Sequence, residues 1–171
     1  MEAIQDIWNY LEEVPDPEIP VISVVDLGVV RDIQLLDDGG LIVTITPTYS
    51  GCPAMNEIQM GIRLKLLEYG YRHVQIQEQL SPAWTTDWLS ESGREKMQAY
   101  GIAPPIAAVG PEADLGRHPR GLFQEERGVH CPQCGSQETK VVSQFGSTAC
   151  KALYQCENCL EPFDYFKCHP Q

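Results

Sequence analysis

Two Cys-x-x-Cys pairs in the last third of the chain have the residue types and the spacing of a metal site. The four cysteines are Cys131, Cys134, Cys156 and Cys159, and a segment with hairpin character lies between the pairs. Four thiolates in this arrangement match the tetrahedral ligand set that zinc prefers. Similar pairs also bind a rubredoxin-type iron or an iron–sulfur cluster. The spacing therefore predicts one metal ion per chain in a zinc ribbon, with structural zinc favoured over iron.

Further residues that could bind metal lie close to these pairs. His130 precedes the first pair, Cys150 lies before the second, and Cys168 with His169 lies near the C-terminus. We interpret His130 as a surface residue. Cys150 could approach the metal, but packing as a small hydrophobic residue is the favoured interpretation. Cys168 and His169 could replace a ligand or bind nothing.

Cys52 lies where a strand is expected to pass into a helix. Pro53 is suited to the first helical position, which would place Cys52 at or next to the N-cap. The free amides and the helix dipole at such a position favour a thiolate, so we expect a lowered pKa and a reactive thiol. The alternative is a buried structural cysteine. A thiol enzyme would also need a base near Cys52. His73 is the only histidine in residues 1–100, and we expect it to be exposed, which disfavours this hypothesis.

The charge distribution excludes some classes of partner. The 171 residues carry a net charge of −12, and residues 1–90 contain 14 acidic and 4 basic side chains. Because nucleic-acid binding requires clustered lysine and arginine, we expect no nucleic-acid partner. No apolar run reaches the length of about 18 residues that a membrane span needs. The N-terminus is acidic and lacks the features of a signal peptide, so we expect a cytoplasmic protein without membrane contact.

The apolar periodicity indicates which elements position these cysteines. Helical spacing predicts helices over residues 3–12, 55–69 and 91–100, and alternation predicts strands over residues 29–36, 41–46 and 73–80. The order α-β-β-α-β predicts an α+β fold, with helices packed on a mixed sheet and a C-terminal zinc ribbon. We expect an α+β domain over residues 1–100, a Pro/Gly-rich linker arm over 101–128 and the ribbon over 129–171.

Several motifs resemble those of a known family. Asp16-Pro-Glu-Ile-Pro20, Asp26-Leu-Gly28 and the Thr46-x-x-x-x-Gly-Cys-Pro53 loop are similar to motifs in iron–sulfur assembly factors related to SufT. That resemblance spans residues 1–100. The Gly-Ile-Ala-Pro-Pro arm, the Cys-Pro-x-Cys-Gly ribbon and the segments 145–151 and 162–168 resemble one branch of this group. The branch is the D subunit family of phenylacetyl-CoA epoxidase, called PaaD or PaaJ.

The resemblance implies an accessory component of the multicomponent 1,2-phenylacetyl-CoA epoxidase of aerobic phenylacetate degradation. It implies a role in assembling or delivering iron–sulfur or iron centres, with the other epoxidase subunits as partners, especially the iron–sulfur reductase. Cys52 would be the reactive thiol and a transient iron or iron–sulfur ligand, with Asp16 and Glu18 as possible neighbours.

The alternative is a structural docking subunit without metal-delivery chemistry. The chain lacks the Glu-x-x-His motifs of a di-iron bundle and the glycine fingerprint of a hydride carrier. We therefore do not expect it to oxidise a substrate by itself.

Overall fold

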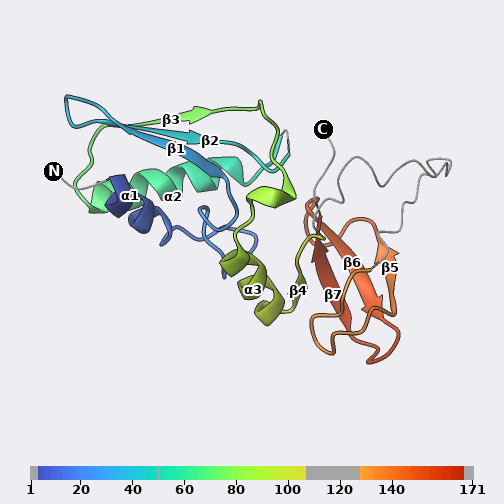
Figure 1. Ribbon diagram of the computed structural model, residues 1–171. Coiled ribbons are helices and arrows are strands. Elements are labelled where there is room, and N and C mark those ends of the chain that lie inside the picture. The colour runs from blue at the N-terminus through green and yellow to red at the C-terminus, as the bar shows by residue number, and fades with distance from the viewer. Residues whose placement is uncertain (1–3, 50, 107–127, 168–171) are drawn as a thin grey trace. The chain divides into compact units, whose positions relative to one another are not determined.

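The computed structural model describes residues 4–49, 51–106 and 128–167, which belong to two compact units (Figure 1). Unit 1 ends at Met97, and unit 2 extends from Gln98 to Lys167. Helices and a mixed sheet make up unit 1, and the cysteine ribbon lies in unit 2, so the α+β fold class predicted from the sequence is confirmed. Residues 107–127 of the expected linker arm lie outside the described residues.

Unit 1 is built on a mixed sheet of three strands in the order β1-β2-β3. β1 (Val30–Leu35) runs antiparallel to β2 (Leu41–Ile45), and β3 (Val74–Glu78) runs parallel to β2. The parallel pair needs a crossover, which α2 (Met55–Glu68) provides. In Figure 1, α1 (Ile4–Leu11) and α2 lie together on one face of this sheet. The helices and strands predicted from periodicity are thus present, with ends that differ by one or two residues.

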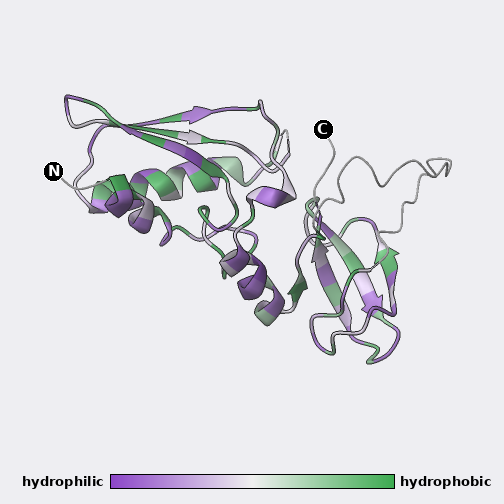
Figure 2. Ribbon diagram, viewed as in Figure 1, coloured by the Kyte–Doolittle hydropathy of each residue, from purple (hydrophilic) through white to green (hydrophobic). Residues whose placement is uncertain are grey.

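The core of unit 1 lies between these two helices and the sheet. Its buried side chains come from every second position of β2 and from one face of each helix, and they include Ile7, Leu11, Leu41, Val43, Ile45, Ile58, Ile62 and Leu66. β3 ends at Glu78, so Leu80, which the predicted strand over residues 73–80 included, lies beyond it and is 53% exposed. α3 (Glu91–Tyr100) is largely hydrophilic (Figure 2). No helix in the described ranges is long and apolar enough to cross a membrane.

The Asp26-Leu-Gly28 motif joins the loop after α1 to the start of α3. The Asp26 carboxylate accepts hydrogen bonds from Ser90 Oγ at 2.7 Å and from Lys96 Nζ at 2.6 Å. Ser90 in turn caps α3, because its Oγ accepts a hydrogen bond from the Gly93 amide at 2.8 Å. Gly28 has φ +71°, and a Cβ at this position would lie 2.3 Å from the Trp88 carbonyl oxygen. Glycine is therefore required at residue 28 by both its backbone conformation and the close contact.

Unit 2 is a four-stranded sheet in the order β4-β7-β6-β5. β5 (Thr139–Ser143) and β6 (Lys151–Cys156) form the hairpin expected between the cysteine pairs. Two further strands, β7 (Pro162–Phe166) and β4 (Ile102–Ala103), were not predicted from the sequence, and β4 pairs in parallel with β7. The first residues of the expected linker arm therefore belong to the ribbon sheet. A two-residue strand has too few positions to show an alternating pattern.

The small core of unit 2 holds aromatic and aliphatic side chains next to two of the pair cysteines. It comprises Ala103, Val129, Cys131, Ala152, Tyr154, Cys156, Phe163 and Tyr165. A core of this size buries little apolar surface, so a metal bound by the four cysteines would supply much of the stability of the ribbon.

Loss of the Asp26 charge should destabilise unit 1. The Lys96 and Ser90 hydrogen bonds lower the pKa of Asp26, although burial, the largest single effect, opposes them. We expect Asp26→Asn to cost about 1–3 kcal/mol of unfolding free energy at neutral pH. Because the folded pKa lies below the unfolded one, this contribution is complete above the ordinary carboxyl pKa and is lost as the pH falls through the lowered value.

Urea unfolding followed by tryptophan fluorescence measures this effect, since Trp8, Trp84 and Trp88 all lie in unit 1. Asp37→Asn in the exposed hairpin turn is the matched control and should change little. Equal stability of the Asp26→Asn variant and the unaltered protein at pH 7 would show that the Asp26 charge does not stabilise unit 1.

Candidate functional site

The four pair cysteines converge on one point. Their sulfur atoms all lie within 4.8 Å of one another, and they are the only such group among the described residues. Cys131 Sγ lies 3.7 Å from Cys159 Sγ, and Cys134 Sγ lies 3.6 Å from Cys156 Sγ. A tetrahedral ion with bonds of about 2.3 Å to sulfur places its ligands about 3.8 Å apart. The cysteine positions therefore fit a tetrahedral metal ion.

Two similar turns hold these thiols in place. In the first, the Gly135 amide donates to the Cys131 carbonyl at 2.9 Å, and Gly135 has φ +74°. In the second, the Cys159 amide donates to Cys156 Sγ at 3.5 Å, and Leu160 occupies the left-handed region with φ +65°. Amides that point at sulfur stabilise thiolates, so the second turn favours the thiolate of Cys156.

The electrostatics of the group favour a bound cation. The Ser136 amide is the main cause that lowers the pKa of Cys134 to about 6. The Glu161 amide lowers the pKa of Cys159, but burial and the neighbouring thiols oppose it and raise that pKa to about 12. The Cys134 thiol therefore ionises readily, whereas the Cys159 thiol keeps its proton because the neighbouring thiols already hold negative charge. A divalent cation removes this conflict by stabilising all four thiolates.

Of the other metal-ligand candidates, the two in the described residues, Cys150 and His130, do not join the group. Cys150 is buried, and its sulfur lies 3.1 Å from Thr148 Oγ1, as expected for a packed residue. His130 is exposed, with Nδ1 3.3 Å from the Gly135 carbonyl oxygen and Nε2 3.2 Å from Gln137 Nε2. His130 thus contacts the first turn without facing the metal. Cys168 and His169 lie outside the described residues.

Cys52 lies in the loop that joins β2 to α2. The sequence analysis placed it at or next to the N-cap, with Pro53 as the first helical residue. In the structure the helix begins at Met55 and Ala54 is the N-cap, so Cys52 lies two residues before the cap. Its carbonyl accepts a hydrogen bond from the Met55 amide at 3.3 Å, which keeps the loop next to the helix start.

The expectation of a lowered Cys52 pKa is wrong. Burial is the largest cause that raises it, and the charges of Glu18 and Asp16 raise it further. Hydrogen bonds with the Ala54 amide and the Tyr49 side chain lower the pKa, but they do not offset these effects. Helix-end stabilisation is weak because Cys52 lies outside the first turn, whereas the thiol is half-buried beside negative charge.

The structure brings the expected carboxylates into the surroundings of Cys52. Asp16 is 5% exposed, and its Oδ1 accepts hydrogen bonds from the Glu18 amide at 2.9 Å and the Ile19 amide at 2.7 Å. This turn within the Asp-Pro-Glu-Ile-Pro motif orders the loop that carries both carboxylates. Tyr49 was not identified from the sequence, although its place three residues before Cys52 was a usable signal.

His73 is not positioned to act as a base for Cys52. It is exposed and precedes β3, and its carbonyl accepts the amide of Leu41 at the start of β2. Cys52 follows the opposite end of β2, beyond Ile45. A strand of this length separates its ends by about 13 Å. The geometry therefore gives no support to a thiol enzyme that uses His73.

Comparisons with known proteins assign both units to described families. The family "Iron-sulfur cluster assembly protein" matches residues 4–71, and the family "PaaD zinc beta ribbon domain" matches residues 116–167. A solved Bacillus anthracis structure, titled as a domain of unknown function, DUF59, covers 54% of this chain and 89% of its own length. It has a TM-score of 0.51 and 23% identity, and so supports the fold of unit 1.

Two sequence relatives extend this result. "Fe-S protein maturation auxiliary factor" of Porphyromonas gingivalis is 37% identical over 53% of this chain and 87% of its own length. The D subunit of the "Putative 1,2-phenylacetyl-CoA epoxidase" of Escherichia coli K12 is 46% identical over 96% of this chain and 93% of its own length. The second match includes the domain, the arm and the ribbon in the same order. With an iron–sulfur assembly domain followed by a four-cysteine zinc ribbon, the chain belongs to the family of phenylacetyl-CoA epoxidase D subunits.

Proposed function

We propose that the protein is an accessory component of a phenylacetyl-CoA epoxidase system that helps to assemble or deliver the iron–sulfur or iron centres of its partners. The observation that carries this proposal is the placement of Cys52 beside Asp16 and Glu18 in an iron–sulfur assembly domain. The thiol offers a sulfur ligand to iron, and the charges of Glu18 and Asp16 act on it from a separate loop. The iron–sulfur reductase is the partner that this role would serve.

The surroundings of Cys52 suit a transient ligand better than a permanent one. The metal must displace a proton from a thiol that is half-buried and faces negative charge. Metal affinity then depends on pH, and protonation of the sulfur favours release. The ribbon, with four converging cysteines, is the contrasting arrangement that favours retention of its ion.

We assign a separate, structural role to the ribbon metal and propose that it is zinc. Four cysteine ligands leave no open position for a substrate or water, which is typical of structural zinc sites. The ribbon would then contribute a folded surface, and chemistry would be confined to unit 1.

Replacing one ribbon ligand should remove the metal and unfold unit 2. We expect the purified protein to contain one zinc per chain without iron charge-transfer bands, and Cys134→Ser to lose most of it. Structural zinc contributes on the order of 10 kcal/mol to small domains, which exceeds what this small core can replace. Elemental analysis and the NMR signals of unit 2 measure both effects.

Cys150→Ser is the matched control for the ribbon, because this buried cysteine lies outside the metal group. It should retain the zinc, and the tryptophan fluorescence of unit 1 should be unchanged in both variants. Iron with visible charge-transfer bands in the anaerobically purified protein would contradict the proposal and show that the ribbon binds iron instead of zinc.

Cys52→Ser tests the delivery role directly. The substitution is nearly isosteric and should leave both units folded, yet it should reduce the iron and sulfide content of the partner reductase in cells. Metal content per reductase polypeptide is the measurement, and Cys150→Ser is again the control. Unchanged cluster loading with Cys52→Ser would refute the delivery role and favour a structural docking subunit.

Glu18→Gln tests whether the carboxylate acts on the thiol. Since the Glu18 charge raises the pKa of Cys52, its removal should lower this pKa. The pH midpoint of Cys52 alkylation should therefore move to lower pH, and alkylation at pH 7 should be faster than in the unaltered protein. Mass spectrometry of the peptide that contains Cys52 follows the rate separately from the other cysteines. The exposed Asp37→Asn variant should match the unaltered protein.

A further inference from the structure

α2 has apolar side chains on two opposite faces. Its inner face buries Ile58, Ile62 and Leu66 in the core of unit 1. On the outer face, Met60, Leu64 and Leu67 are 54%, 58% and 53% exposed, respectively. Their spacing of four and three residues places them in one stripe along the helix. The surface side of a helix is ordinarily polar, so this outer stripe is expected to be covered by another molecule.

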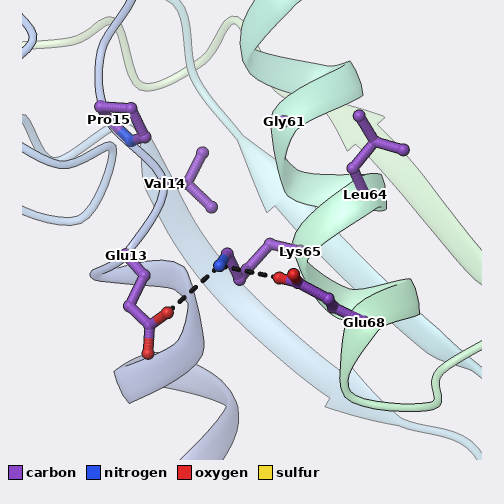
Figure 3. Close-up of a pocket in the computed structure, with 7 residues that line it drawn as sticks. All are labelled: Glu13, Val14, Pro15, Gly61, Leu64, Lys65 and Glu68. Carbon is purple, nitrogen blue, oxygen red and sulfur yellow. Dashed lines mark hydrogen bonds and ion pairs between the residues drawn. The ribbon is translucent and has the colours of Figure 1, made fainter.

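A pocket lies beside the stripe. Its volume is about 330 Å³, and Val14, Pro15, Gly61 and Leu64 supply its apolar lining. In Figure 3, Leu64 and Gly61 come from α2, while Val14 and Pro15 come from the chain that follows α1. A Cβ on Gly61 would lie 3.1 Å from Val14 Cγ1, so glycine lets α2 pack closely against Val14 beside the pocket. The pocket can accept one apolar side chain next to Leu64.

Charged side chains border the pocket and leave an excess of negative charge. Lys65 Nζ lies 3.1 Å from Glu13 Oε2 and 2.8 Å from Glu68 Oε2, as the dashed lines in Figure 3 mark. One ammonium group is thus shared by two carboxylates. Exposed Glu57 and exposed Arg63 lie one turn before and one turn after Met60, and their charges balance, so Glu13 and Glu68 supply the negative excess. The border therefore complements a partner with basic groups.

We propose that the outer face of α2 is a docking site for an amphipathic, basic helix of a partner protein. A large apolar side chain of that helix occupies the pocket beside Leu64, and lysine or arginine side chains pair with Glu13 and Glu68. Helices commonly bind in such grooves through apolar residues spaced three and four apart. The acidic charge of residues 1–90, with 14 acidic and 4 basic side chains, opposes a second copy of this chain as the occupant.

This docking site is independent of metal binding at Cys52. Failure of the delivery role would leave the α2 contact intact, and loss of the contact would leave metal binding by Cys52 unchanged. The two proposals can therefore be tested separately.

Two synthetic peptides serve as probes for the full-length protein. Both have about 18 residues and leucines at helical spacing on one face; one carries lysines on the flanks and the other carries glutamates. We expect the basic peptide to bind in fluorescence anisotropy, and the acidic peptide to show no measurable binding. In ¹⁵N NMR spectra, the basic peptide should shift amide signals of residues 57–68 and leave those of residues 128–167 in place.

Variants on the stripe identify the contact. Leu64→Gln should weaken basic-peptide binding about tenfold or more, as expected for a central apolar contact. Glu68→Gln should weaken it less and reduce its dependence on salt. Leu80→Gln is the matched control, since Leu80 is 53% exposed outside α2 and its loss should not change binding. Met60→Gln provides a second stripe variant, and circular dichroism checks that each variant remains folded.

Three results would overturn the proposal. They are equal binding of both peptides, basic-peptide binding that Leu64→Gln and Met60→Gln leave unchanged, and no binding of either peptide. A concentration-dependent dimer that dissociates with Leu64→Gln would also overturn it, because the occupant would then be a second copy of the chain.

Discussion

A thiolate in this protein is stable only where amides or a cation offset its charge, and this constraint separates the two cysteine sites. In the ribbon, four thiols converge within 4.8 Å, and amide donors reach their sulfur atoms. This concentration of charge is unfavourable unless a metal ion is present. The sheet around it has a small core, so a metal bound there would be coupled to the folding of unit 2.

Cys52 experiences the opposite balance. Its amide and tyrosine donors are outweighed by burial and by the Glu18 and Asp16 charges, so the thiol holds its proton more strongly than an ordinary cysteine. These effects disfavour the free thiolate, and a positive ion bound at Cys52, as the proposed delivery role requires, would offset them.

α2 connects the site to the rest of unit 1. Its inner face anchors the mixed sheet, its N-terminal end follows the Cys52 loop, and its outer face leaves Met60, Leu64 and Leu67 in solvent. A helix that is apolar on both faces costs solubility in the isolated protein, and an occupied outer face removes that cost. Docking on α2 would bring a partner to the helix that begins beside Cys52.

Sequence periodicity alone determined the main elements of unit 1, because α1, α2 and the strands of the mixed sheet follow the burial pattern of adjacent residues. The spacing of Cys131, Cys134, Cys156 and Cys159 likewise indicated the metal site, since two cysteines separated by two residues in a tight turn can reach a single ion. The resemblance carried by short motifs correctly indicated the family.

Only the tertiary structure decided the features that depend on contacts between distant segments. β4 was hidden because its two residues acquire strand geometry through pairing with β7. The pKa of Cys52 was mispredicted because local helix-end effects were weighed without the burial and the Asp16 and Glu18 charges that a separate loop supplies. Helical spacing indicated the face of α2 that is buried, with Ile58, Ile62 and Leu66, but the exposure of the apolar stripe on the opposite face is visible only in the packed structure.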